Sequence, residues 1–181
     1  MSTSHDPIVI PEPAPSRVPL RLAMARPGRN RLDGGWWPQS RDLAVELADL
    51  VDHFPAEHGR IARALVSPPD WEGSLRRVRV GDGERIVKVG RFPHDDTHEV
   101  HLRTSDRTVL RVLVVPPGYS EAQGSEALLA AATTGNAHPA GDLLVTVTQD
   151  PDVDPRDHWR DDGGTWWDPE PVAPSYRTDE A

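Results

Sequence analysis

Apolar residues recur at helical spacing in one clear stretch of the chain, which begins after Ser40. The apolar positions are separated mainly by three or four residues, and acidic residues fall between them: Leu43, Leu47, Leu50, Val51 and Phe54. This spacing places the apolar side chains on one face of a helix. We expect Ser40 to cap the helix, Asp42 to suit its positive N-terminal end, and Pro55 to end it.

Between residues 60 and 115 the pattern changes to short apolar or alternating runs with turn residues between them. Such runs predict strands, with a further one near the N-terminus, at residues 18–25, 60–67, 75–80, 84–90, 97–103 and 108–115. The segments 81–83 and 105–107 are expected to form hairpin loops. Because residues 109–115 are almost continuously apolar, we expect the last strand to lie centrally with both faces covered.

A stretch rich in Ala and Leu predicts a second helix over residues 120–133, with Gly135 and Asn136 as its stop. The run 142–148 is ambiguous between helix and strand. Together these elements predict an α+β fold, with an antiparallel β meander of five to six strands and two helices.

Proline and acidic residues dominate the two ends of the chain. Four prolines in the first 17 residues favour an extended chain, and Asp-Pro steps repeat beyond residue 149. We therefore expect a disordered Pro-rich lead at 1–17, a single domain at 18–148, and a disordered acidic, Trp-containing tail at 149–181. The hydrophobic share of 36% and the mean hydropathy of −0.57 fit a folded centre diluted by such ends.

Charge is unevenly distributed along the chain. The net charge is −9, and residues 149–181 carry most of it, with three Arg against ten acidic residues. This acidic balance argues against general nucleic-acid binding, which needs a positive surface. The chain has no cysteine, which excludes disulfides and thiolate chemistry. With no apolar run long enough to span a bilayer and no start typical of a signal peptide, we expect a cytoplasmic protein.

Residues 31–43 form a particular motif, Arg-Leu-Asp-Gly-Gly-Trp-Trp-Pro-Gln-Ser-Arg-Asp-Leu. With Trp71 and the Leu-Val-Val-Pro-Pro run at 113–117, this motif resembles the signature of a family of uncharacterised actinobacterial proteins, a domain of unknown function. The resemblance spans roughly residues 18–130. It implies one domain without the two ends, and it carries no activity, ligand or active site.

The loop that contains Asp33, Trp36 and Trp37 is the leading candidate for a ligand-binding feature. Side chains of adjacent residues in an extended chain point to opposite faces, so the two tryptophans cannot enter the same core. We expect one of them to be buried and the other exposed, as a platform for a sugar, a base or a protein partner. The alternative is a structural corner in which Asp33 accepts backbone hydrogen bonds and both rings cover the start of the helix.

The segment 94–101 contains three histidines and three acids, but their spacing is not that of a metal site. In a strand, His98 and His101 point to opposite faces, so a full ligand set does not assemble on either side. We also find no Ser/His/Asp set, nucleophile elbow or phosphate loop. The sequence therefore predicts no catalytic residue, no metal ligand and no cofactor.

Basic residues cluster between residues 75 and 92, within an otherwise acidic protein. Two hairpin strands would gather them into one basic face: Arg76, Arg77, Arg79, Arg85, Lys88 and Arg91. The tail segment around Trp166 and Trp167 has the opposite charge and is aromatic. We expect a weak contact within the same molecule between this tail and the basic face, the alternative being a solvated charged face and an idle tail.

These features favour a non-catalytic binding or regulatory module that uses the Trp-bearing loop, with an unidentified protein or small molecule as its partner. Two alternatives remain: a metal-dependent enzyme that uses residues 94–101, and a nucleic-acid binder that uses the Arg-rich hairpin.

Overall fold

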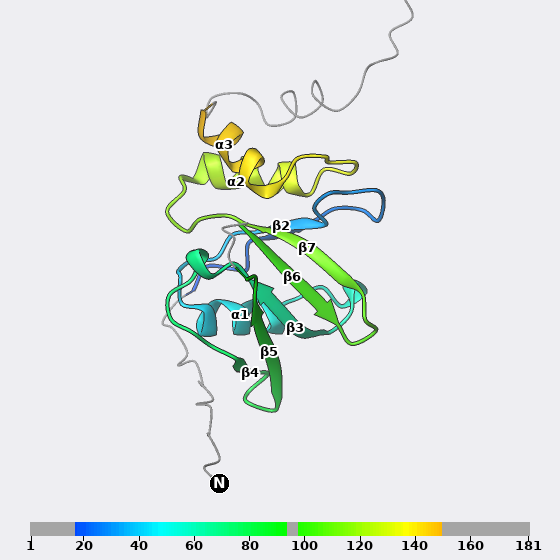
Figure 1. Cartoon of the computed structure of the whole chain (residues 1–181), viewed down its shortest axis with the longest axis vertical. Helices are drawn as coiled ribbons and strands as arrows, with labels where there is room; N and C mark the ends of the chain where they lie inside the picture. The colour runs from blue at the N-terminus through cyan, green and yellow to red at the C-terminus, as the bar shows by residue number, and fades with distance from the viewer. Residues whose placement is uncertain (1–16, 94–97, 150–181) are drawn as a thin grey trace, which may run out of the picture.

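The computed structural model describes residues 17–93 and 98–149 (Figure 1). The expected disorder of the lead and of the tail therefore falls almost entirely outside the described residues. Within them the chain forms three α-helices and seven strands, so the α+β class is confirmed.

The helix α1 spans Leu43–Asp52 and presents an apolar face that is fully buried. Its N-cap is Asp42, whose carboxylate accepts from the backbone N–H groups of Ala44 and Val45 at 3.0 and 3.3 Å. The expectation that Ser40 caps the helix is wrong, because the Ser40 hydroxyl instead donates to the buried carboxylate of Glu46 at 2.7 Å.

All seven strands belong to one mixed sheet of order β1-β2-β7-β6-β3-β5-β4. Their bounds are Leu22–Met24 (β1), Gly34–Trp36 (β2), Ile61–Val66 (β3), Arg77–Val80 (β4), Arg85–Arg91 (β5), Glu99–Thr104 (β6) and Val109–Val114 (β7). Short 3₁₀ turns at Ala56–His58 and Pro68–Asp70 flank β3.

The predicted antiparallel meander is wrong in topology. Two neighbouring pairs are parallel, β2 with β7 and β3 with β5, while the other four pairs are antiparallel. The hairpin β4–β5 turns at residues 81–84, and β6–β7 turns at 105–108, both near their predicted loops. The missed strand is β2, which is three residues long and has glycine at two of them, so it has almost no side-chain pattern.

Each side of the sheet has its own hydrophobic core. On the inner face, α1 packs over Val78, Val80, Val87 and neighbouring apolar residues of β3, β6 and β7. On the outer face, α2 (Glu121–Ala131) contacts β1, β2 and β7, and α3 (Ala140–Gln149) packs against α2. Figure 1 shows α2 and α3 together beside the β2–β7 end of the sheet, with α1 on the other side near β3 and β4.

The helix α2 begins with a capping box. The Ser120 hydroxyl accepts from the backbone N–H of Gln123, whose side chain accepts from the backbone N–H of Ser120. The third helix, α3, settles the ambiguous run after residue 140 as helical and corrects the predicted count of two helices. Its buried side chains, Leu143, Leu144 and Val147, belong to the outer core, and the helix packs against α2.

The strand β7 is the third in the sheet and only partly fits the expectation of a central, doubly covered strand. Leu113 and Val114, near its end, are buried on opposite faces, whereas Val109 at its start is 51% exposed. The helix layer therefore covers one end of the strand and leaves the other open on the outer face.

Candidate functional site

The two loop tryptophans are both buried, so the expectation that one of them is an exposed platform is wrong. Trp36 is 0% and Trp37 is 3% exposed. They do point to opposite faces, as extended geometry requires: Trp36 stacks on Trp71 in the inner core, with ring centroids 5.3 Å apart, and Trp37 lies in the outer core. The sequence could not show that a second core covers the outer face at this position.

Residues from two other segments contact the Trp37 ring. Gly124 of α2 lies against the ring, and a Cβ there would overlap it. The guanidinium of Arg21 lies 3.6 Å from the ring centroid, and burial lowers the pKa of Arg21 below its ordinary value. Both contacts cover the ring of Trp37, which is 3% exposed.

Asp33 has a structural position in the same loop. Its Oδ2 accepts from the backbone N–H of Arg111 at 2.8 Å, and its own N–H donates to the carbonyl of Arg111 at 2.6 Å. These bonds tie the start of β2 to β7. The structural reading of the Asp33–Trp37 loop therefore fits its geometry better than the ligand-binding reading.

The histidine segment is described only from His98 onward. Nδ1 of His98 lies 3.0 Å from Oδ1 of Asp70, and Nε2 of His101 lies 3.2 Å from Oε2 of Glu99. Within residues 17–93 and 98–149, no group of three His, Asp or Glu side chains is placed to hold a metal ion. The described part of the segment brings its histidines to separate carboxylates.

Four basic side chains from four neighbouring strands lie in one register row on the outer face. Arg77 pairs with Lys88 across β4 and β5, and Lys88 pairs with Arg63 across β5 and β3. Arg63 in turn pairs with Arg103 across β3 and β6. We call this set the basic row: Arg77, Lys88, Arg63 and Arg103. Since neighbouring strands lie about 4.8 Å apart, it extends about 14 Å across the sheet.

The basic row places four like charges side by side on an exposed surface. All four side chains are exposed to solvent. Within residues 17–93 and 98–149, none of them makes a hydrogen bond or an ion pair with another side chain. Like charges placed directly opposite each other destabilise a sheet, so this arrangement costs stability in the isolated protein.

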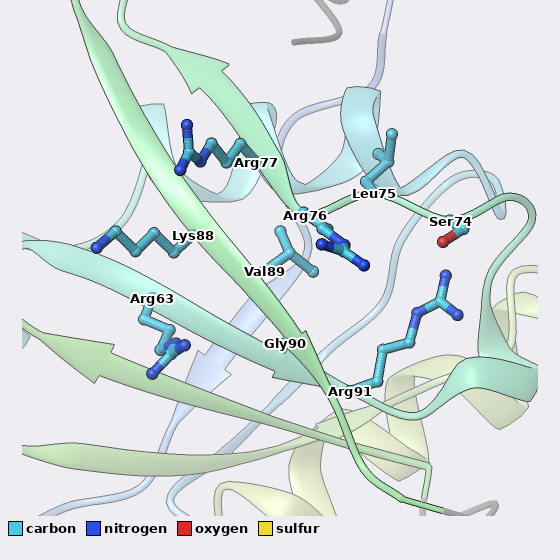
Figure 2. A pocket seen from close by; sticks show the side chains of 9 residues that line it. All are labelled: Arg63, Ser74, Leu75, Arg76, Arg77, Lys88, Val89, Gly90 and Arg91. Atoms are coloured by element: carbon cyan, nitrogen blue, oxygen red, sulfur yellow. The ribbon is translucent and has the colours of Figure 1, made fainter. Parts of the chain in front are cut away.

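An open groove of about 500 Å³ lies at the β4 and β5 end of the basic row (Figure 2). Five of its nine lining residues are basic and none is acidic: Arg63, Ser74, Leu75, Arg76, Arg77, Lys88, Val89, Gly90 and Arg91. The groove is open because β4 begins only at Arg77, so beside Gly90 the sheet has no regular edge strand. Gly90 has no side chain, and Leu65 lies over it.

The structure places the six residues of the predicted basic face in different positions. Arg77 and Lys88 lie on the outer face, and Arg76 and Arg91 line the groove. Arg79 is on the same side but donates to the carbonyl of Gly83 at 3.2 Å. Arg85 does not join this face, because it pairs with Val80 on the inner side and donates to the carbonyl of Ile61 at 3.1 Å.

Two members of the row, Arg63 and Arg103, were missed by the sequence prediction. Each stands next to a buried apolar residue of its own strand, Arg63 before Ala64 and Arg103 after Leu102, which was a partial signal that both are exposed. What the sequence did not contain was the parallel pairing of β3 with β5, which brings Arg63 beside Lys88.

Two exposed apolar side chains flank the basic row. Ile86, 45% exposed, pairs with Arg79 two positions along the β4–β5 hairpin from the Arg77–Lys88 pair, and Val109 of β7, 51% exposed, pairs with Arg103. The open part of the outer face therefore offers cations in the middle and apolar contact at the margins.

Comparison with known proteins places the chain in a family but not in a functional class. Among the described residues, no helix has the length and apolar character needed to cross a membrane. No curated protein and no solved structure matches the chain. A family model, described as "Family of unknown function (DUF5994)", matches residues 19–131, which run from β1 to α2 and include the whole basic row. Because this match covers more than half of the 181 residues, the chain belongs to that family of unknown function.

Proposed function

We propose that the protein is a binding module that holds an acidic segment of a protein partner on the open half of its outer sheet face. The observation that carries this proposal is the basic row, in which four neighbouring strands each contribute one exposed cation at the same register position. A row of this kind forms only when the strands pair in this order, because the four residues are far apart in the sequence.

The energetics support a role in binding. Directly opposed like charges are destabilising by a few tenths of a kcal/mol to about 1 kcal/mol per pair, and the row contains three such neighbouring pairs. Carboxylates placed between the cations would turn this repulsion into charge-assisted hydrogen bonds. The row is thus more stable when an acidic ligand is bound to it than when it is free.

An acidic peptide fits the surface better than a nucleic acid does. The net charge of −9, most of it in residues 149–181, opposes the approach of any polyanion and opposes a long polyphosphate most, whereas a short peptide contacts only the local basic surface. The apolar margins at Ile86 and Val109 would accept the apolar side chains of a peptide that carries both acids and hydrophobic residues.

The test is fluorescence anisotropy with a short labelled peptide in which Glu alternates with Trp. The double variant Arg63→Glu/Lys88→Glu should weaken binding by about tenfold or more, equivalent to about 1.4 kcal/mol. The matched control is Arg26→Glu/Arg29→Glu, which makes the same change of charge at two exposed arginines in the β1–β2 connection.

Equal losses in the two variants would overturn the assignment of the site, because they would show an effect of net charge alone. Tighter binding of a labelled single-stranded oligonucleotide than of the peptide would overturn the assignment of the partner. Circular dichroism and the urea midpoint of each variant confirm that the fold is retained.

A further inference from the structure

We propose that the acidic segment 150–181 of the same chain occupies the basic row in the absence of a partner and competes with the partner for it. This inference rests on the proposed function and adds its regulation. It combines three observations: where the described chain ends, which face the end lies on, and how the charge and aromatic content of the remaining segment match the row.

The described chain ends close to the N-terminal end of β6, two strands from the groove. The helix α3 ends at Gln149, and the Thr148 hydroxyl lies 3.1 Å from the Tyr119 hydroxyl. Thr148 and Tyr119 line a cavity together with His98, the residue directly before β6. The segment 150–181 therefore begins next to the N-terminal end of β6.

The groove is two strands away from that point. Val100 of β6 pairs with Val66 of β3, and Val66 pairs with Arg91 of β5, which lines the groove. Two strand spacings amount to about 10 Å, which about three extended residues cover. Because α2 and α3 pack on the outer face, the segment leaves the helix layer on the side that carries the basic row, and no path around a sheet edge is needed.

The composition of the segment matches the open surface. Residues 150–181 contain ten acids against three Arg, and they include Trp159, Trp166 and Trp167. Exposed ion pairs alone contribute little and are screened by salt. Contact of a Trp ring with the apolar margin at Ile86 or Val109 supplies a component of binding that salt does not screen.

Tethering makes a weak contact effective. A tether of about this length typically supplies an effective concentration near the millimolar range, so an intrinsic dissociation constant of about 1 mM leaves the row about half occupied. A partner must then displace the segment, and its apparent affinity falls by about twofold or more. By competing for the basic row, the segment prevents weakly binding acidic ligands from occupying it.

Lys88 is the only lysine of the chain and lies within the basic row, which allows a specific test by zero-length cross-linking. A carbodiimide joins a lysine amine to a carboxylate in direct contact and takes up the water released. In the full chain we expect cross-links within one molecule between Lys88 and acids of 150–181, identified by mass spectrometry. The variant Arg63→Glu/Arg103→Glu, which keeps Lys88, should reduce their yield severalfold, whereas Arg26→Glu/Arg29→Glu should not. Cross-links confined to Asp82 and Glu84 in the adjacent turn would overturn the inference.

A second measurement separates failure of this inference from failure of the proposed function. In the full chain, the ten acids of 150–181 are replaced by their amides and the three tryptophans by Ala, and the labelled Glu/Trp peptide is titrated. We expect the peptide to bind at least about twofold tighter than to the wild type. Unchanged binding overturns the competition and leaves the proposed function intact, whereas no binding to either protein overturns both.

Discussion

The outer face of the sheet has two halves that differ in what covers them. Over β1, β2 and β7 it carries Gly35 and Leu113, and α2 packs closely there, so that a Cβ on Gly35 would lie 3.1 Å from the side chains of Ala131 and Leu128. Over β4, β5, β3 and β6 it carries the basic row, which is exposed. On the inner face, both halves have the same kind of apolar core.

This difference separates residues that build the fold from residues available for function. Where α2 packs, the outer positions Gly35 and Leu113 are glycine and apolar, and close packing explains both. Where no described helix packs, folding requires no particular residue, yet the positions hold cations in register. Valine, threonine or a mixture of charges would stabilise an exposed sheet better than a row of like charges.

The largest loss of stability that we predict comes from a substitution in the covered half of the outer face. Trp37→Ala should destabilise the protein by about 3–5 kcal/mol because it opens a cavity between β2, α2 and α3. Trp36→Ala should cost a similar amount through the inner core. Urea unfolding monitored by circular dichroism measures both. A loss well under 1 kcal/mol for Trp37 would mean that α2 does not cover it, and would contradict the division into halves.

The next effect is smaller and tests the closeness of helix packing. Gly124→Ala should gain about 1 kcal/mol from helix propensity, but the added methyl overlaps the ring of Trp37 and overpacking typically costs about 1–3 kcal/mol or more. We therefore expect a net loss of about 1–2 kcal/mol in the free energy of unfolding. The matched control is Gly141→Ala in α3, where a Cβ meets nothing within 4 Å and the propensity gain should appear as increased stability.

In the open half we predict a gain of stability together with a loss of binding. Arg63→Thr removes two directly opposed cation contacts and should raise the unfolding free energy by a few tenths of a kcal/mol to about 1 kcal/mol. The same variant should weaken binding of the Glu/Trp peptide. Measuring the urea midpoint and the dissociation constant on one sample tests both effects, and a variant that loses stability and keeps binding would contradict the account.

The smallest effect is expected in the turn between β6 and β7. Hydrogen bonds from the Thr104 hydroxyl and from the backbone N–H of Thr108 lower the pKa of Asp106 below its ordinary value. A lowered folded-state pKa stabilises the protein above the unfolded-state value of about 3.9, and this stabilisation is lost as pH falls through the folded-state pKa. Asp106→Asn should therefore lower the thermal midpoint slightly at pH 7, and the difference from wild type should disappear at low pH. A difference that persists at low pH would contradict the assignment to the carboxylate.

Much of the local structure was predictable from the sequence, but the pairing of the strands was not. Periodicity located α1, α2 and the strands β3 to β7, because a buried face repeats every 3.6 or every 2 residues. The strand β2 and the parallel pairs could not be predicted, since Gly34-Gly35-Trp36 carries no alternation and pairing depends on contacts far apart in the chain. The basic row could be predicted only in part for the same reason. The sequence showed that the hairpin is rich in cations, but Arg63 and Arg103 join the row only through the order of the strands.

The most direct test of the open half as the binding surface uses the single lysine as a spectroscopic probe. Reductive methylation with ¹³C-formaldehyde labels Lys88 and retains its charge, so that its methyl resonance reports on the centre of the basic row. During titration with the Glu/Trp peptide, our account predicts a saturable shift of the Lys88 resonance, while the backbone amides of α2 and β2 remain unchanged. A fixed Lys88 resonance accompanied by shifts in α2 and β2 would contradict it.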